Sequence, residues 1–352
     1  MSGTRAERRA GGNHVWVREL GRPIVGKLIG LVAIVCVLVG GRRIAFSIQD
    51  FGTVSPAARS IGDDGLWLSH LWVDGRKDSA DVTALAAELR NTGIKDVFVH
   101  TGPLSDDGSL DPALYPKAQW FVAEMHQMLP GVRVQAWLGD EITPQGGMNL
   151  ESGTTRDRIV GSIRSALAVG FDGVHLDFEP IGDADPGYLN LLDQVRPVVH
   201  SAGALLSVSA EQVEPVPGTR WAMEAVEGHD SWWSAGYLHQ VAIRVDEVAV
   251  MSYDTGLWSS SAYSGFVRDE TSAALAAVPP SVTLLMGAPA YHNANNLGHV
   301  EAAETVTAAI RGVRLALPGG TPNGRAFGVA LYMDYYATAA DWDAYNSDWL
   351  SP

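Results

Sequence analysis

The sequence predicts one α/β domain built as a closed (β/α)8 barrel, and three observations support this fold class. Short apolar runs rich in β-branched and aromatic residues recur from about residue 60 to the C-terminus. Amphipathic stretches separate them, as expected for a parallel sheet whose strands are covered on both faces. About eight such units fill residues 61–352, which matches a barrel of this type in number and length.

The predicted strands are short apolar runs. They cover residues 66–73, 95–101, 132–138, 172–179, 205–210, 247–253, 282–289 and 327–333. The clearest helices are expected at 78–93, 154–170 and 185–203, and the last begins with a capping Asp185 followed by Pro186. A doubly wound open sheet is the alternative, but it requires a glycine-rich loop after the first strand. Residues 70–79, "HLWVDGRKDS", do not supply one.

The N-terminus forms a separate region. Residues 28–41, "LIGLVAIVCVLVGG", carry no charge, and six basic residues precede them. The charge distribution predicts a cytoplasmic tail and membrane anchor over residues 1–45, a linker over 46–60, and an extracytoplasmic domain over 61–352. A cleaved signal peptide, which would give a secreted protein, is the alternative, followed by a buried helix of a cytosolic protein.

The bulk composition restricts the function. The net charge of -15 argues against nucleic acid as a partner, since binding to nucleic acid needs a basic surface. The single cysteine and the absence of an HExxH or paired-histidine spacing predict no catalytic metal, and no cofactor motif is present. Nothing in the sequence indicates the oligomeric state.

The fourth predicted strand, "DGVHLDFE" (172–179), carries the strongest functional signal. Side chains alternate along a strand, so His175, Asp177 and Glu179 share one face. In a barrel this face points inward and ends at the C-terminal rim, where barrel active sites lie. Two neighbouring carboxylates disfavour double ionisation, which makes Glu179 a candidate proton donor near neutral pH.

These residues resemble the DGxDxDxE signature of glycoside hydrolase family 18, the chitinases and endo-N-acetylglucosaminidases. "MSYD" (251–254) is similar to the MxYD motif of that family, and "LLMGAPAYH" (284–292) is similar to its seventh strand. The three matches follow in order on the fourth, sixth and seventh strands, and the resemblance covers residues 62–349. It implies a retaining hydrolase of β-1,4-linked N-acetylglucosamine glycans, in chitin-like material or peptidoglycan.

The resemblance also implies a role for each matching residue. Glu179 is the acid/base, and Asp177 holds the 2-acetamido group of the substrate, whose own oxygen attacks the anomeric carbon. Tyr253 is expected to hydrogen-bond the acetamido carbonyl, and Asp254 to contact the sugar. His175, Trp258, Tyr291 and Tyr332 complete the expected substrate site, with Trp258 chosen because exposed aromatic faces stack on sugars.

Two residues depart from the family pattern. The middle Asp of the signature is His175 here, and Tyr332 stands where the family usually has a Trp on the eighth strand. His175 is expected beside Asp177 as a charged pair, because an adjacent unit charge should outweigh the effect of burial. The substitutions leave open a glycan-binding barrel that has lost hydrolysis. A third hypothesis is a retaining enzyme in which Glu211 is the nucleophile. It requires the two catalytic carboxyl groups of the enzyme to lie about 5–5.5 Å apart.

Overall fold

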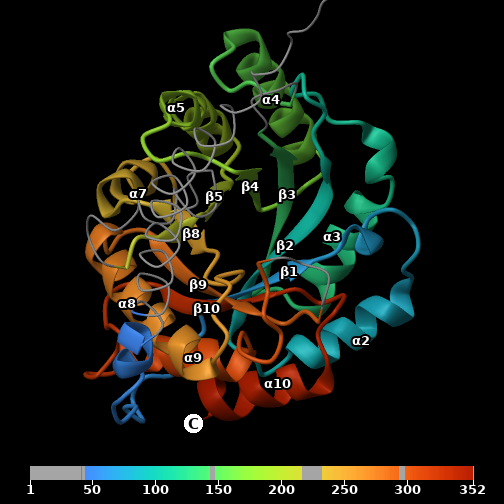
Figure 1. Ribbon diagram of the computed structural model, residues 1–352. Helices are drawn as coiled ribbons and strands as arrows, with labels where there is room; N and C mark the ends of the chain where they lie inside the picture. The colour runs from blue at the N-terminus through green and yellow to red at the C-terminus, as the bar shows by residue number, and fades with distance from the viewer. Residues whose placement is uncertain (1–40, 42–43, 143–146, 216–231, 293–297, 352) are drawn as a thin grey trace, which may run out of the picture. The chain divides into compact units, whose positions relative to one another are not determined.

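The computed structural model describes residues 41, 44–142, 147–215, 232–292 and 298–351. Within this part of the chain, eight parallel strands close into a barrel (Figure 1). Their bounds are β1 Asp64–Leu68, β2 Ile94–Pro103, β3 Arg133–Glu141, β4 Gly173–Glu179, β5 Leu205–Ala210, β8 Glu247–Val250, β9 Thr283–Pro289 and β10 Phe327–Tyr332. The predicted closed parallel barrel is therefore confirmed, and the open-sheet alternative is excluded.

Neighbouring strands follow the order β1-β10-β9-β8-β5-β4-β3-β2, so that β1 pairs with both β2 and β10. A short separate pair, β6 Gln212–Val213 and β7 Trp232–Trp233, follows β5. The register of β3 against β4 aligns Gly139 with Asp177 and Glu141 with Glu179. The ends of these two strands therefore reach the same rim of the barrel together.

Helices alternate with the strands and surround the barrel in Figure 1. They are α2 Ser79–Leu89, α3 Ala118–Met128, α4 Gly153–Leu167, α5 Pro186–Ser201, α7 Ala235–Ala242, α8 Ser260–Ala277, α9 Val306–Leu315 and α10 Ala339–Tyr345. As predicted, Asp185 caps α5 by accepting a hydrogen bond from the Tyr188 amide at 2.8 Å, and Pro186 is its first residue.

The core has two parts because the strands alternate their side chains. One large apolar cluster lies between the outer face of the barrel and the helices. A smaller cluster fills the inside of the barrel and consists of Trp67, Phe98, Trp137, Ala249, Leu285 and Ala330. The barrel is thus a packed core below its mouth, as is usual for this architecture.

The first strand is shorter than the sequence predicts. The expected strand over 66–73 ends at Leu68, and His70–Trp72 forms a 3-10 helix instead. Asp334 explains the early end, because its carboxylate accepts hydrogen bonds from the Ser69 amide at 2.8 Å and from the Trp72 indole at 2.6 Å. The chain therefore turns away from the barrel after Leu68, and Trp72 is buried outside the barrel, next to Phe121.

The segment before the barrel packs against it. Phe46 is buried and contacts Phe266 of α8 edge-to-face, with ring centroids 5.4 Å apart. Arg311 of α9 donates to the Asp50 carboxylate at 2.7 Å, and Ala58 is fully buried. Residues 46–60, expected to be a linker, therefore make specific contacts with α8 and α9.

The predicted membrane anchor lies almost entirely outside the described residues. Among the residues that the structure does describe, no helix has the length and apolar character that crossing a bilayer requires. The expectation for residues 1–45 therefore stays a prediction from the sequence.

Replacement of Phe46 tests whether residues 46–60 belong to the folded domain. Phe46→Ala should lower the free energy of unfolding by about 3 kcal/mol, because it opens a cavity against Phe266. Phe51 is 80% exposed, so Phe51→Ala is the matched control and should stay within about 0.5 kcal/mol of the wild type. Urea unfolding followed by tryptophan fluorescence measures both, and equal midpoints for the two variants would contradict the packing role.

Candidate active site

Strand β4 brings three polar side chains to the inside of the barrel and three apolar ones to its outside. Val174, Leu176 and Phe178 are buried in the cluster that packs against the helices. His175, Asp177 and Glu179 alternate with them and point inward, so the predicted alternation is confirmed. Glu179 is the last residue of the strand, at the mouth of the barrel.

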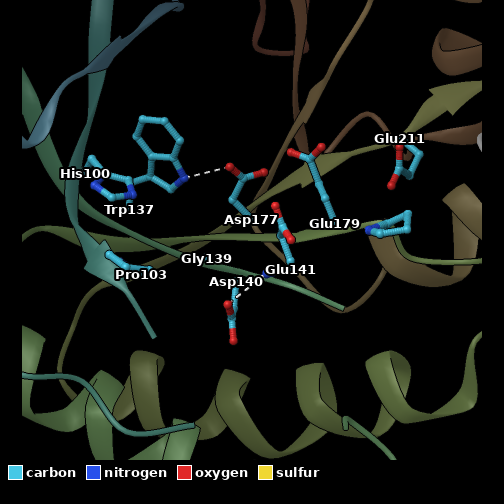
Figure 2. A pocket seen from close by; sticks show the side chains of 10 residues that line it. His100, Pro103, Trp137, Gly139, Asp140, Glu141, Asp177, Glu179 and Glu211 are labelled. Carbon is cyan, nitrogen blue, oxygen red and sulfur yellow. Dashed lines mark hydrogen bonds between the residues drawn. The ribbon is translucent and has the colours of Figure 1, made fainter. Parts of the chain in front are cut away.

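The carboxyl groups of Asp177 and Glu179 lie next to each other (Figure 2). The Trp137 indole donates a 2.7 Å hydrogen bond to Asp177 Oδ2 and holds this carboxyl in place. Gly139 on β3 lets the strands approach here, because a Cβ at this position would lie 2.3 Å from the Asp177 carbonyl oxygen. The pair is therefore fixed by both neighbouring side chains and backbone.

This arrangement favours the protonated form of Glu179. The protein atoms packed around its carboxyl raise its pKa well above the usual value, and the negative charge of Asp177 raises it further. Burial also raises the pKa of Asp177, while hydrogen bonds from Ser209, Glu179 and Trp137 lower it. The hydrogen bonds thus favour the charge on Asp177 and leave the proton on Glu179.

Two pockets meet at the carboxyl pair. The larger has a volume of about 730 Å³ and is shown in Figure 2; its polar and aromatic lining consists of His100, Trp137, Asp140, Glu141, Asp177, Glu179 and Glu211. The smaller has a volume of about 280 Å³ and is lined by Trp67, Asp177, Glu179, Ser209, Met251, Tyr253, Asp254, Tyr291, Tyr332 and Tyr336. A chain-like ligand could therefore have one unit on each side of Glu179.

Tyrosines form the wall of the smaller pocket. Tyr253 and Tyr332 are stacked with ring centroids 5.2 Å apart, and Tyr291 donates a hydrogen bond to Asp254. Burial raises the pKa of Tyr253 and of Tyr332 above the usual value. Their hydroxyl groups consequently remain hydrogen-bond donors at physiological pH.

Trp258 lies apart from these residues. It follows β8 and is 70% exposed, but it lines neither of the two pockets. Its contact with a sugar stays a prediction.

The structure corrects the expected role of His175. The residue is fully buried beneath the pocket, so it cannot contact a substrate. Its ring stacks on Phe98 at 4.0 Å, and its nitrogens bond to Ser207 Oγ at 2.7 Å and Ser209 Oγ at 2.9 Å rather than to Asp177. Burial lowers its pKa to about 3, so the expected ion pair with Asp177 is also wrong.

The hydrogen bonds also define the tautomer of His175. The indole N–H of Trp67 can only donate, and it lies 3.2 Å from His175 Nε2, which must therefore accept. The proton of the neutral ring is then on Nδ1 and is donated to Ser207. Ser209 Oγ lies 2.9 Å from His175 Nε2 and also neighbours Asp177; its one O–H can donate to either of them, but not to both.

A column of polar groups continues from His175 to the floor of the barrel. Ser207 lies close to Glu247, and the Gln135 amide donates to Glu247 at 2.9 Å and to Asp96 at 2.8 Å. Burial, together with the charge of Asp96, raises the pKa of Glu247 to about 8, so Glu247 is largely neutral at pH 7. The column gives partners to several polar groups that the closed barrel buries, while Gln135 Oε1 and Glu247 Oε2 have no hydrogen-bond partner among the described residues.

Some pocket residues were not predicted to belong to the site. Asp140 and Glu141 reach the mouth because β3 continues to Glu141, three residues beyond its predicted end. His100 also lines the larger pocket, where burial lowers its pKa to about 4. An acidic end to the run "VQAWLGDE" was the available signal in the sequence.

Asp172 and Glu211 are two further carboxylates near strand β4 and the larger pocket. Asp172 accepts hydrogen bonds from the Val134 amide at 2.7 Å and contacts His126 at 2.8 Å, outside both pockets, in keeping with a structural role. Glu211 lines the larger pocket and its Oε1 accepts from the Ile181 amide at 3.1 Å.

The state of His175 can be tested directly. We expect its imidazole to remain neutral from pH 5 to pH 9, with the proton on Nδ1, because the lowered pKa lies below this range. Long-range ¹H–¹⁵N correlation spectra report protonation and tautomer together. The solvent-accessible His70 serves as the internal control, and a His175 resonance that titrates between pH 5 and pH 8 would contradict the neutral column.

Comparison with known proteins gives evidence for the fold. No protein-family model matches the chain, and no curated protein sequence matches it. Solved structures do match: the spore cortex-lytic enzyme SleL of Bacillus megaterium QM B1551 has a TM-score of 0.57 at 14% identity and covers 84% of this chain and 75% of its own.

Two further structures are similar over nearly their whole length. A class V chitinase from Pseudomonas fluorescens Pf-5 has a TM-score of 0.56 at 16% identity, covering 81% of this chain and 98% of its own. A glycoside hydrolase family 18 N-acetylglucosaminidase from Paenibacillus barengoltzii has a TM-score of 0.52 at 14% identity, covering 80% and 98%. At these identities the likeness shows that the barrel fold is shared.

Proposed function

We propose that this protein is a retaining glycoside hydrolase of the family 18 type that cleaves β-1,4-linked N-acetylglucosamine glycans. The observation that carries the proposal is the Asp177–Glu179 pair at the mouth of the barrel, where the surroundings keep a proton on Glu179. The motifs "DGVHLDFE" and "MSYD" support it. The barrel shared with structures described as chitinases and an N-acetylglucosaminidase agrees with it.

In the proposed mechanism, Glu179 donates its proton to the glycosidic oxygen as the bond from this oxygen to the anomeric carbon breaks. The acetamido oxygen of the same sugar forms the new bond to that carbon, which gives a cyclic intermediate and retains configuration after hydrolysis. Water then attacks the anomeric carbon as the bond from this carbon to the acetamido oxygen breaks, and the carboxylate of Glu179 takes the proton of the water. No enzyme carboxylate becomes bonded to the sugar.

The neighbouring residues fit this chemistry. The carboxylate of Asp177 can accept a hydrogen bond from the acetamido N–H, and its position is fixed by Trp137. The hydroxyl of Tyr253 is a donor for the acetamido oxygen, and it lines the smaller pocket together with Asp254. Tyr332 would stack under the sugar in that pocket, with a smaller ring than the tryptophan of the family pattern.

The charge of the larger pocket narrows the substrate class. Among the described residues, its lining contains five acidic side chains and neither lysine nor arginine; these are Asp140, Glu141, Asp177, Glu179 and Glu211. Coulomb repulsion would disfavour a glycan that carries carboxylates at this position. We therefore favour neutral amino-sugar chains over strongly anionic ones.

The location of the protein is also a proposal. The basic residues before the apolar stretch 28–41 favour an N-terminal anchor that holds the barrel outside the cytoplasm. The substrate would then be a glycan of the cell envelope or one reaching the cell surface.

A glycan-binding protein without hydrolysis is the second candidate. It is favoured by His175, which replaces a carboxylate of the family signature with a neutral ring. Incubation with N-acetylglucosamine oligomers distinguishes the two, because a binding protein retains the oligomers at their original length. The third hypothesis, in which Glu211 is the nucleophile, predicts hydrolysis that does not depend on an acetamido group of the substrate.

Replacement of Glu179 tests the proposed chemistry. Glu179→Gln should lower kcat/KM by about 10²–10⁴-fold on chromogenic N-acetylglucosamine oligomers, because the variant has no proton to donate. The surface variant Glu151→Gln is the control and should match the wild type. Wild-type turnover by Glu179→Gln would refute the assignment.

The role of the acetamido group needs a different substrate. Oligomers that lack the acetyl group should not be turned over by the wild-type protein, since the attacking oxygen is absent. Equal turnover of both substrates would point to an enzyme nucleophile such as Glu211.

A further inference from the structure

Three potential metal-ligating side chains converge behind the tyrosine wall of the smaller pocket. Asp254 follows β8, while His299 and Glu304 precede α9. His299 Nδ1 lies 3.5 Å from Asp254 Oδ1 and 3.3 Å from Glu304 Oε2. One ligand atom from each of the three residues lies within 4.8 Å of the other two.

His299 is the unusual member of this cluster. Its side chain is fully buried, and its ring packs on Tyr291 with centroids 4.3 Å apart. Neither ring nitrogen has a hydrogen-bond partner among the described residues. A buried polar atom left unpaired costs about 1–3 kcal/mol, so a ligand on Nδ1 would remove a real penalty.

The distances indicate which ligand fits. A charge-assisted N–H···O bond is typically about 2.7–2.9 Å long, which is shorter than both contacts of His299 Nδ1. Tetrahedral sites with metal–ligand bonds of about 2.0–2.2 Å separate their ligand atoms by about 3.3–3.6 Å. The observed 3.3 Å and 3.5 Å match the edges of such a tetrahedron.

Hydrogen bonds from other groups hold the two carboxylates in place. Tyr291 donates to Asp254 Oδ1, and the Asp254 amide donates to Glu304 Oε2 at 2.7 Å. Thr255 donates to Glu304 Oε1 twice, from its amide at 3.0 Å and its hydroxyl at 2.8 Å. Such outer contacts orient the ligands of metal sites, and Glu304 Oε2, which accepts only the Asp254 amide, is the oxygen that faces His299 Nδ1.

We propose that Asp254, His299 and Glu304 form a binding site for a divalent cation of the zinc type. The site would join the loop after β8 to the segment before α9 and so fix the wall made by Tyr253 and Tyr291. It goes beyond the proposed hydrolysis, in which Asp254 contacts the sugar, and it differs from the sequence-based expectation of no metal. No local motif indicates this site, because its ligands come from two separate connections.

Zinc titration of the full chain tests the proposal. After chelator treatment and dialysis, calorimetry with zinc chloride should give one site per chain. Zinc should also raise Tm. Cobalt(II) should show the visible absorption of tetrahedral coordination, and none of these measurements depends on glycan hydrolysis.

Two histidine variants provide the comparison. His299→Asn should weaken zinc binding on the order of 100-fold or more, because it removes a direct ligand. His292 also lies between two carboxylates, at 2.9 Å from Asp341 and 3.3 Å from Glu301, but its side chain is 39% exposed. His292→Asn should bind zinc like the wild type.

The outcomes separate the possibilities. Absence of zinc binding by the wild type, or equal affinity of wild type and His299→Asn, would overturn the proposal. Should His299→Asn fail to fold, as judged by circular dichroism, Asp254→Asn replaces it with the same expected loss. If the wild-type protein bound zinc but hydrolysed no glycan, the proposed hydrolase function would be refuted and the proposed metal site would be supported.

Discussion

The closed barrel imposes the constraint on which the site depends: polar groups inside it are cut off from water and must find partners in the protein. The column from Asp96 and Gln135 through Glu247, Ser207 and His175 to Ser209 meets most of this requirement, with Gln135 Oε1 and Glu247 Oε2 left without a partner among the described residues. Its upper end is the Asp177–Glu179 pair. The position of the catalytic candidates therefore rests on the hydrogen-bonding groups below them.

This constraint also accounts for the histidine in the signature. A charged group at position 175 would need a counter-charge inside the barrel, and the neighbours are Trp67, Phe98 and two serines. A neutral imidazole satisfies Trp67, Ser207 and Ser209 together. The proton needed for catalysis can then remain at the rim, on Glu179, instead of being shared with a deeper carboxylate.

Local pattern was sufficient to predict most of the fold. The fifth strand was placed at its observed ends, 205–210, because an apolar run between turn signals is a local property. The predicted first strand runs past the observed end of β1 because Asp334, which is far away in the sequence but follows the neighbouring strand β10, binds Ser69 and Trp72. Such a contact leaves no trace in the local sequence.

The local sequence pattern also predicts part of the active site. Alternation along β4 correctly put His175, Asp177 and Glu179 on one face, but it does not identify the cross-strand neighbours. Ser207 and Ser209 come from β5 and occupy both ring nitrogens of His175, which therefore does not bond to Asp177, and burial keeps the ring neutral. His299 and Glu304 were missed because loops follow no period that would bring them to Asp254.

The central claim is that the surroundings, with Asp177 among them, keep the proton on Glu179. Titration of the Glu179 carboxyl by ¹³C NMR in the wild type and in Asp177→Asn tests it most directly. We predict a wild-type pKa well above the usual value for a glutamate, because burial and the charge of Asp177 both raise it, and a lower pKa in the variant. An ordinary wild-type pKa, or the same pKa in both proteins, would contradict the account.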